Sequence, residues 1–444
     1  MSHQQPSNTV VAIAGTFGAV YLAVLPMSGT IALRNVTLVG LLLVLTWCLY
    51  TSRLSLRPGW LFLLWAAYLL LFPVISSDPA VAWQNLGGQW ARSLLAISAG
   101  AGLAFLLNRS SWGTVLHLGI VSAVPLLVHL ALVIWKIYET GGIPWGYWGR
   151  EKHHADLGYA AGQATILLAV AAVSGAGRWR PAIITLIICA LLSTVVAYSR
   201  AGLVFAIFGG VLVCLLALLK VSGHQRRRIL GITLTLLVVA LILGFLALKK
   251  DSRWQTTTDK LRWGLLAGQA LEVACHGQAS IESVVIEQLG SGAYANQIID
   301  SVVRDGDGAR VVALRVGLQL SLHHPWGSDG SREAFRKLLL GYCPDPVLQI
   351  AHAHNGWVDT LLAIGWGGAL LYLLLMLAFL RCGLVGIREN SSVQLPWALV
   401  LSALALFWIL RGLADSVYRD HMLEMQGFML AYAWANLRIF SRSD

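Results

Sequence analysis

Two histidines one residue apart, His352 and His354, precede an asparagine and then an apolar run that begins near residue 358. An imidazole that is neutral near pH 7 can take a proton from an attacking hydroxyl. Asn355 suits the N-cap of the helix that follows. Two histidines without a nearby cysteine or carboxylate cluster are a weak signal for zinc. We interpret His354 as a candidate general base and His352 as its support, with a structural role as the alternative for each and no metal.

Arginines come next, because a planar guanidinium can donate two parallel hydrogen bonds to phosphate oxygens. Arg200 lies in the run Ala-Tyr-Ser-Arg-Ala-Gly between two apolar stretches, with almost no loop to solvate it. An ionisable group in such a place is a candidate for anion binding, and a topological charge that snorkels to the surface is the alternative.

Two further arginines, Arg310 and Arg315, lie where apolar residues recur at helical spacing until Pro325 ends the pattern. The pattern predicts an amphipathic helix on or just above a membrane that presents both guanidinium groups. Solvated charges on a surface helix are the alternative.

The acidic residues give weaker evidence for a functional site. Arg411, Asp415, Arg419 and Asp420 crowd one short stretch, where an internal set of salt bridges is the default and makes Arg411 and Asp415 supporting candidates. Asp305 and Asp307 flank a glycine and are typical of a turn. Cys275 and Cys343 could form a disulfide if both face an oxidising compartment, and the sequence leaves this open.

These residues must be positioned by membrane helices. Of 444 residues, 57% are hydrophobic and 12% are charged, against about 25% charged in a soluble domain. The apolar runs are long enough to cross about 30 Å of hydrocarbon as helices. The net charge of +11 is scattered through short loops without interleaved aromatics, so membrane topology explains it better than nucleic-acid binding. The composition excludes a water-soluble protein.

We expect an all-α polytopic protein with about twelve spans, at residues 10–25, 36–50, 60–75, 94–107, 115–135, 157–174, 182–197, 203–219, 230–248, 358–380, 397–410 and 422–437. The excess of Lys and Arg in alternate short loops, above all the Arg226, Arg227 and Arg228 cluster, places both termini in the cytoplasm. The polar segment between the ninth and tenth spans then faces outward. The predicted divisions are 1–248 for the first nine spans, 249–357 for the outward segment and 358–444 for the last three spans.

The order of these motifs resembles the O-antigen ligase and O-antigen polymerase superfamily, and O-antigen ligases more narrowly. The resemblance rests on Ser-Arg-Ala-Gly at an outward turn, Arg310 with Pro325 fifteen residues later, His-x-His-Asn before a span, and a Gly-x-Gly-Gly stretch. It covers residues 199–368 by motif and the whole chain by span number and loop position.

The resemblance implies a GT-C-like glycosyltransferase of the bacterial inner membrane, with a periplasmic active site and no cofactor. It implies transfer of O-antigen glycan from undecaprenyl pyrophosphate to a sugar hydroxyl of lipid A core, with inversion. Arg200 and Arg310 match the functional arginines of the family, Arg315 could replace Arg310, and His354 matches the proposed catalytic histidine. An O-antigen polymerase or a protein O-oligosaccharyltransferase shares these motifs. A lipid-linked glycan transporter would also need outward arginines, but the paired half-repeats typical of transporters are not evident.

Overall fold

The computed structural model describes residues 7–27, 29–51, 59–108, 110, 113–149, 154–175, 177–277, 279–303, 306–389, 394–418 and 420–440. Within these ranges the regular elements are all helices. Each predicted span lies in one helix or ends one residue beyond it. In chain order these helices are α1 (Asn8–Val24), α2 (Ile31–Tyr50), α3 (Trp60–Ile75), α5 (Ala91–Leu107), α6 (Val115–Thr140), α7 (His154–Val173), α8 (Arg180–Val196), α9 (Arg200–Leu218), α10 (Gly223–Lys250), α17 (Gly356–Glu389), α18 (Leu395–Ala414) and α19 (Asp420–Phe440).

Length and composition support the membrane assignment. Nine helical stretches of the described chain are long and apolar enough to cross a membrane, and α1 and α3 are apolar but shorter. The prediction of an all-helical, polytopic membrane protein is confirmed, while the count of twelve crossings stays a prediction. Short elements join some of these helices: α4 (Pro79–Asn85) with the π-helical turn η1 (Leu86–Trp90) after α3, and the 3-10 turn η3 (Gly177–Trp179) before α8.

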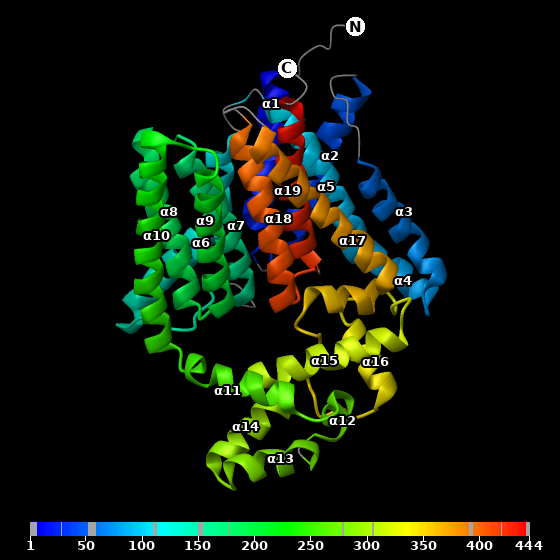
Figure 1. Ribbon diagram of the computed structural model, residues 1–444. Helices are drawn as coiled ribbons and strands as arrows, with labels where there is room; N and C mark the ends of the chain where they lie inside the picture. The colour runs from blue at the N-terminus through cyan, green and yellow to red at the C-terminus, as the bar shows by residue number, and fades with distance from the viewer. Residues whose placement is uncertain are drawn as a thin grey trace.

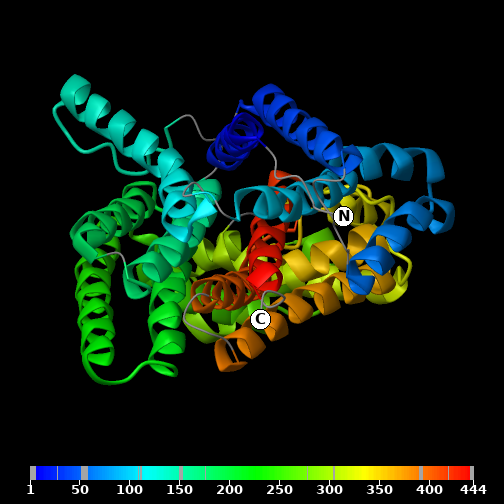
Figure 2. The same ribbon diagram turned by 90° about the horizontal axis from the view of Figure 1, so that it is seen from above.

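The long helices stand side by side as a bundle, and α1 begins at the end of it where α19 ends (Figure 1). The basic start of α10, with Arg226, Arg227 and Arg228, lies at this same end. Seen from above, α18 and α19 lie between a group made of α6 to α10 and a group made of α1 to α5 with α17 (Figure 2).

The polar segment between α10 and α17 folds into further helices at the opposite end of the bundle, which we call the outer end (Figure 1). They are α11 (Arg253–Leu266), α12 (Ala270–His276), α13 (Ala279–Leu289), α14 (Ala293–Val303), α15 (Asp307–His323) and α16 (Ala334–Tyr342). The predicted helix before Pro325 is thus present, and it buries Val312, Val316 and Leu320. A disulfide joins Cys275 to Cys343, with 5.9 Å between the Cα atoms, and so ties α12 to the end of α16.

The helix α17 is broken at Gly365, which has a φ of 74°, where the sequence predicts one uninterrupted span. The turn after α15 fits into this break: the amide of Trp366 donates to the carbonyl of Pro325 at 2.9 Å. A Cβ on Gly365 would come within 2.5 Å of the Trp326 carbonyl carbon, so only glycine allows this approach. The arm of α17 before the break therefore packs with the outer helices.

Candidate functional site

The guanidinium of Arg200 forms a two-point ion pair with the carboxylate of Asp307. Nη2 donates to Oδ1 at 2.8 Å and Nη1 to Oδ2 at 3.0 Å. Arg200 is the first residue of α9 and Asp307 is the first residue of α15, so the pair joins the membrane bundle to an outer helix. A carboxylate also suits the first turn of a helix, where it faces the positive end of the helix dipole. The interpretation of Asp307 as a turn residue is therefore wrong, and Asp305 lies outside the described residues.

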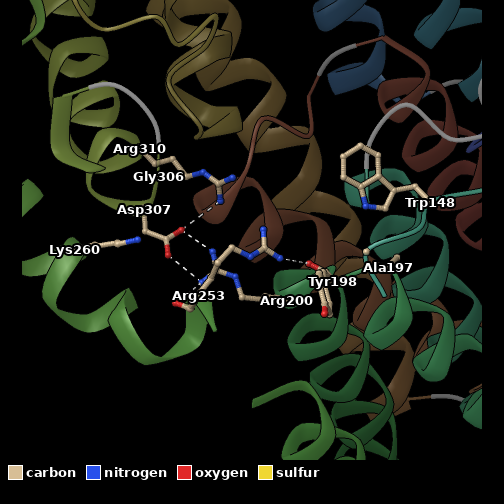
Figure 3. A pocket seen from close by; sticks show the side chains of 10 residues that line it. Trp148, Ala197, Tyr198, Arg200, Arg253, Lys260, Gly306, Asp307 and Arg310 are labelled. Carbon is tan, nitrogen blue, oxygen red and sulfur yellow. Dashed lines mark hydrogen bonds and ion pairs between the residues drawn. The ribbon is translucent and has the colours of Figure 1, made fainter. Parts of the chain in front are cut away.

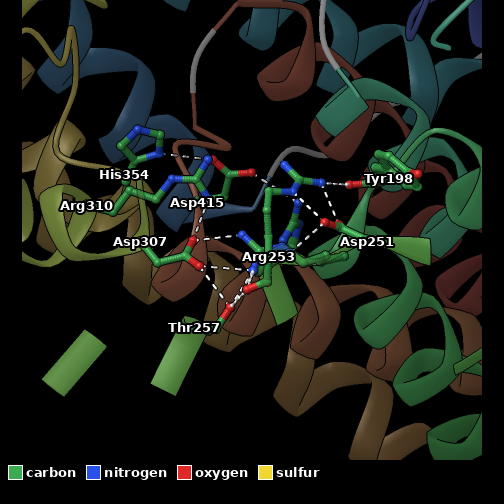
Figure 4. A network of polar contacts seen from close by, with 10 residues as sticks. Tyr198, Asp251, Arg253, Thr257, Asp307, Arg310, His354 and Asp415 are labelled. Atoms are coloured by element: carbon green, nitrogen blue, oxygen red, sulfur yellow. Dashed lines mark hydrogen bonds and ion pairs between the residues drawn. The ribbon is translucent and has the colours of Figure 1, made fainter. Parts of the chain in front are cut away.

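Further groups surround this pair (Figure 4). The hydroxyl of Thr257 lies 3.0 Å from Oδ2 of Asp307, and Nη1 of Arg310 lies 3.6 Å from Oδ1. Burial alone would raise the pKa of the Asp307 carboxyl, but hydrogen bonds and charge from Arg200, with Thr257 and Arg310, lower it below its ordinary value. Asp307 is therefore ionised at neutral pH and holds two arginines at one place.

A cavity of about 380 Å³ opens beside the ion pair (Figure 3). It is lined by Gly146, Trp148, Ala197, Tyr198, Arg200, Arg253, Lys260, Gly306, Asp307 and Arg310. Four of these side chains are cationic and one is a carboxylate. The lining therefore carries a net positive charge, at a place where α8, α9, α11 and α15 meet, and suits an anion with several oxygens.

Arg253 and Lys260 were not found by the sequence analysis. Arg253 is the first residue of α11; its Nε and Nη2 donate to the carboxylate of Asp251 at 2.8 and 2.7 Å, and Nη2 also donates to the carbonyl of Tyr198 at 2.9 Å. Lys260 lies two turns further along the same helix. The signal available in the sequence was the density of charge just after the ninth span, where Lys249, Lys250, Asp251 and Arg253 follow one another within five residues.

Arg315 occupies a different place from Arg310. Its Nη1 donates to the carbonyls of Gly264 and Ala267, and its Nη2 donates to the carbonyl of Gly268 at 2.6 Å. These carbonyls are at the C-terminal end of α11, where the last carbonyls of a helix lack partners within the helix. Arg315 therefore fastens α11 to α15, and Arg310, five residues earlier, lines the cavity.

The second part of the site is the segment before α17. His354 has a φ of 52°, which is unusual for a residue other than glycine, and its Nδ1 lies 4.0 Å from Oδ1 of Asp415. The rings of His352 and His354 meet edge to face, 4.3 Å apart. Asn355 caps α17, as expected: its Oδ1 accepts from the amide of Val358 at 3.1 Å, and its Nδ2 donates to the carbonyl of Leu413 at 2.9 Å. The cap fixes the start of α17, directly after the two histidines.

Asp415, just after α18, faces His354 with Oδ1 and is held in place through its other carboxylate oxygen. Its Oδ2 accepts from the hydroxyl of Tyr159 at 2.8 Å and from Nη2 of Arg411 at 3.1 Å. Burial would raise the pKa of this carboxyl, but the charge of Arg411, together with His354 and Tyr159, lowers it. An ionised carboxylate beside an imidazole fixes its orientation and favours uptake of a proton by the ring. The predicted Arg411–Asp415 salt bridge is present; Arg419 and the side chain of Asp420 lie outside the described residues.

Both parts of the site lie at the outer end. Figure 4 shows His354 at the end of the polar network where Arg310 lies, with Tyr198 at the other end. Among the described residues, no three side chains of the types His, Cys, Asp and Glu come together as a set that could hold a metal ion. The arrangement brings a cluster of cationic side chains and an imidazole paired with a carboxylate to the same end of the bundle.

The comparison with protein families matches this part of the chain. The family model described as O-antigen ligase matches residues 184–373, a little under half of the chain, and this stretch contains Arg200, Asp307, Arg310 and His354. No curated protein matches the chain. The motif order noted in the sequence, the helical bundle and the matched stretch agree, and together they support the O-antigen ligase/polymerase superfamily for residues 184–373.

Proposed function

We propose that the protein is an inner-membrane glycosyltransferase that moves O-antigen glycan from undecaprenyl pyrophosphate to a sugar hydroxyl of lipid A core, on the periplasmic side. Two features of the outer end of the bundle support this proposal, the cationic cavity and the His354–Asp415 pair. Figure 4 shows His354 at the end of the polar network where Arg310 lies. Pyrophosphate is a good leaving group that needs neutralising charge, and a sugar hydroxyl is a poor nucleophile that needs a base. The two parts of the site supply these two requirements.

On the donor side, Arg200, Arg310 and Arg253 would hold the pyrophosphate oxygens, with Lys260 adding charge. Negative charge on these oxygens grows as the glycosidic bond breaks, so donors placed in advance stabilise the transition state more than the ground state. Asp307 keeps the guanidinium groups of Arg200 and Arg310 in place before the donor arrives. Arg315 is assigned to anchoring α11 rather than to the donor.

On the acceptor side, His354 would take the proton of the attacking hydroxyl, with His352 in support. Asp415, held by Arg411 and Tyr159, orients the imidazole. Direct attack with departure of the lipid pyrophosphate inverts the anomeric centre, and the scheme uses no metal and no nucleotide.

The test is transfer by the purified protein in proteoliposomes that contain lipid-linked O-antigen and rough lipopolysaccharide, without ATP and with a chelator. A ladder of glycan on lipid A core supports the ligase. Longer lipid-linked glycan instead identifies a polymerase, and glycan on an added acceptor protein identifies a protein O-oligosaccharyltransferase. Movement of intact donor across the bilayer without any new glycosidic bond identifies a transporter and contradicts the proposal.

A further inference from the structure

The cavity has two chemically different ends, and Figure 3 shows them on opposite sides of Arg200. One end is formed by α11 and α15 and carries Lys260, Asp307 and Arg310. The other end is formed by the loop between α6 and α7 and the turn between α8 and α9, and its largest side chain is Trp148. The first end therefore suits an anionic group, while at the second end Trp148 adds an apolar surface beside Arg253, which donates to the carbonyl of Tyr198.

Trp148 is held in place by its neighbours in the loop. The amide of Gly146 donates to the carbonyl of Val196 at 2.8 Å, and the carbonyl of Tyr147 accepts from His129 at 3.0 Å. The ring of Trp145 stacks on Tyr198 with 6.3 Å between centroids. The three residues before Trp148 are thus fastened to α6, α8 and the α8–α9 turn, and the indole of Trp148, 37% exposed, lines the cavity.

The loop that carries Trp148 follows α6, a helix long and apolar enough to cross a membrane. Exposed apolar residues follow one face of α6 at spacings of four, seven and three residues and reach its outer end, namely Val124, Val128, Trp135 and Tyr138. The chain then enters the loop that carries Trp148. This apolar face of α6 leads toward the loop, and the exposed Lys136–Glu139 ion pair lies beside its outer end, where the indole of Trp135 donates to Glu139 at 2.7 Å.

The candidate base lies toward the other end. In Figure 4, His354 lies beside Arg310, away from Tyr198. If His354 acts on an attacking hydroxyl, the anomeric carbon of the donor must lie on the Arg310 side of the pyrophosphate. The lipid on the far side of the pyrophosphate then lies toward Tyr198 and Trp148.

We infer that Trp148 is a carrier-binding residue: it contacts the isoprene units next to the pyrophosphate, and the donor crosses the cavity with its sugar toward Arg310 and its lipid toward Trp148. This inference rests on the proposed function and adds to it the direction of the donor and a residue for the lipid. An indole buries a large apolar area against hydrocarbon at a small cost in conformational entropy.

The test compares three probes that share the pyrophosphate group: inorganic pyrophosphate, undecaprenyl pyrophosphate and the glycan-bearing lipid donor. Dissociation constants are measured in detergent for wild type, Trp148→Ala and Trp148→Phe. The alanine variant should weaken both lipid probes about tenfold and leave inorganic pyrophosphate unchanged, and phenylalanine should restore most of the affinity. Trp83→Ala, at an exposed tryptophan on α4 remote from the cavity, is the matched control and should change none of the three.

Two results overturn the inference. Equal weakening of all three probes means that Trp148 only shapes the cavity, and weakening of the glycan-bearing donor alone means that the indole stacks on sugar, so that the donor lies the other way round. If the proposed function is wrong, the result differs: the wild-type protein binds undecaprenyl pyrophosphate in the binding test but forms no glycosidic bond with any acceptor in the transfer test. Because the variant comparison uses binding alone, it can be read whether or not transfer occurs.

Discussion

The carboxylate of Asp307 and the guanidinium of Arg200 are separated by 107 positions in the sequence and share two hydrogen bonds of 2.8 and 3.0 Å. One partner begins a membrane helix and the other begins an outer helix. The side chain of Arg200 is 15% exposed and that of Asp307 is 12% exposed, so the pair is largely shielded from solvent. The cavity beside this pair is therefore assembled only when the outer helices dock on the bundle.

Asp307→Asn should lower stability by about 2 kcal/mol at pH 7, because it leaves two guanidinium groups without their shared carboxylate. The pKa of Asp307 is lowered in the folded protein, so its contribution is present above the unfolded value of about 3.9 and is lost as the pH falls through the folded value. The difference in thermal midpoint between wild type and variant, measured in detergent, should thus shrink below about pH 4. A difference that stays constant across this range contradicts the role of the ion pair.

Arg200→Lys and Arg310→Lys should weaken donor binding about tenfold or more, because an ammonium keeps the charge but cannot form the two-point contact of a guanidinium. Arg315→Lys is the matched control: its side chain contacts carbonyls of α11, so the variant should lose stability and keep donor affinity. Titration with undecaprenyl pyrophosphate measures the first effect and thermal unfolding the second. If Arg315→Lys loses as much donor affinity as Arg310→Lys, Arg315 also binds the phosphate groups and the assignment to anchoring α11 is wrong.

His354→Ala should reduce glycan transfer about 10²- to 10⁴-fold while the variant stays folded and still binds lipid-linked donor. His352→Ala should do less harm. Asp415→Asn should also reduce transfer, because it removes the charge that orients the imidazole. The measurement is the initial rate in proteoliposomes with a chelator present. Near-normal transfer by His354→Ala would end its assignment as the base.

Replacing Cys275 and Cys343 together by serine should lower stability by about 3–4 kcal/mol on the chain-entropy model, since the disulfide closes a loop of 68 residues in sequence separation. Cys382→Ser, at a free and partly exposed cysteine, is the control and should change little. Thermal unfolding of the oxidised proteins measures the effect. Reaction of wild type with a thiol reagent at both Cys275 and Cys343, without reductant, would show that the bridge does not form in the cell.

Reporter fusions test the orientation. A fusion at Ser222, between α9 and α10, should report the cytoplasm, and one at Gly290, after α13, should report the periplasm. Both reporters on the same side would contradict the proposed topology.

The sequence predicts the membrane helices well, because a bilayer demands long apolar runs with internally satisfied backbone groups. It also points to Arg200, Arg310 and His354, since charged and titratable groups near spans are costly without a function. Asp307 was missed because its partner lies on another helix, and spacing along the chain carries no information on such a pair. Arg310 and Arg315 differ only in which face of α15 they occupy and what packs there. The break at Gly365 depends on the approach of the turn at Trp326, a tertiary contact.

The break at Gly365 also divides α17 into two arms that pack against different parts of the protein. The arm of α17 before Gly365 packs against α15, where a Cβ on Gly317 would meet Val358 within 2.7 Å, so His354 and Arg310 are carried by the same outer body. The arm after Gly365 belongs to the lipid-embedded bundle and must follow the thickness and tilt that the surrounding lipids impose. A change of angle at Gly365 can absorb such adjustments while the spacing between His354 and Arg310 stays fixed. The reaction geometry would then be insensitive to bilayer thickness, whereas access of the lipid carrier at the Trp148 end would depend on it.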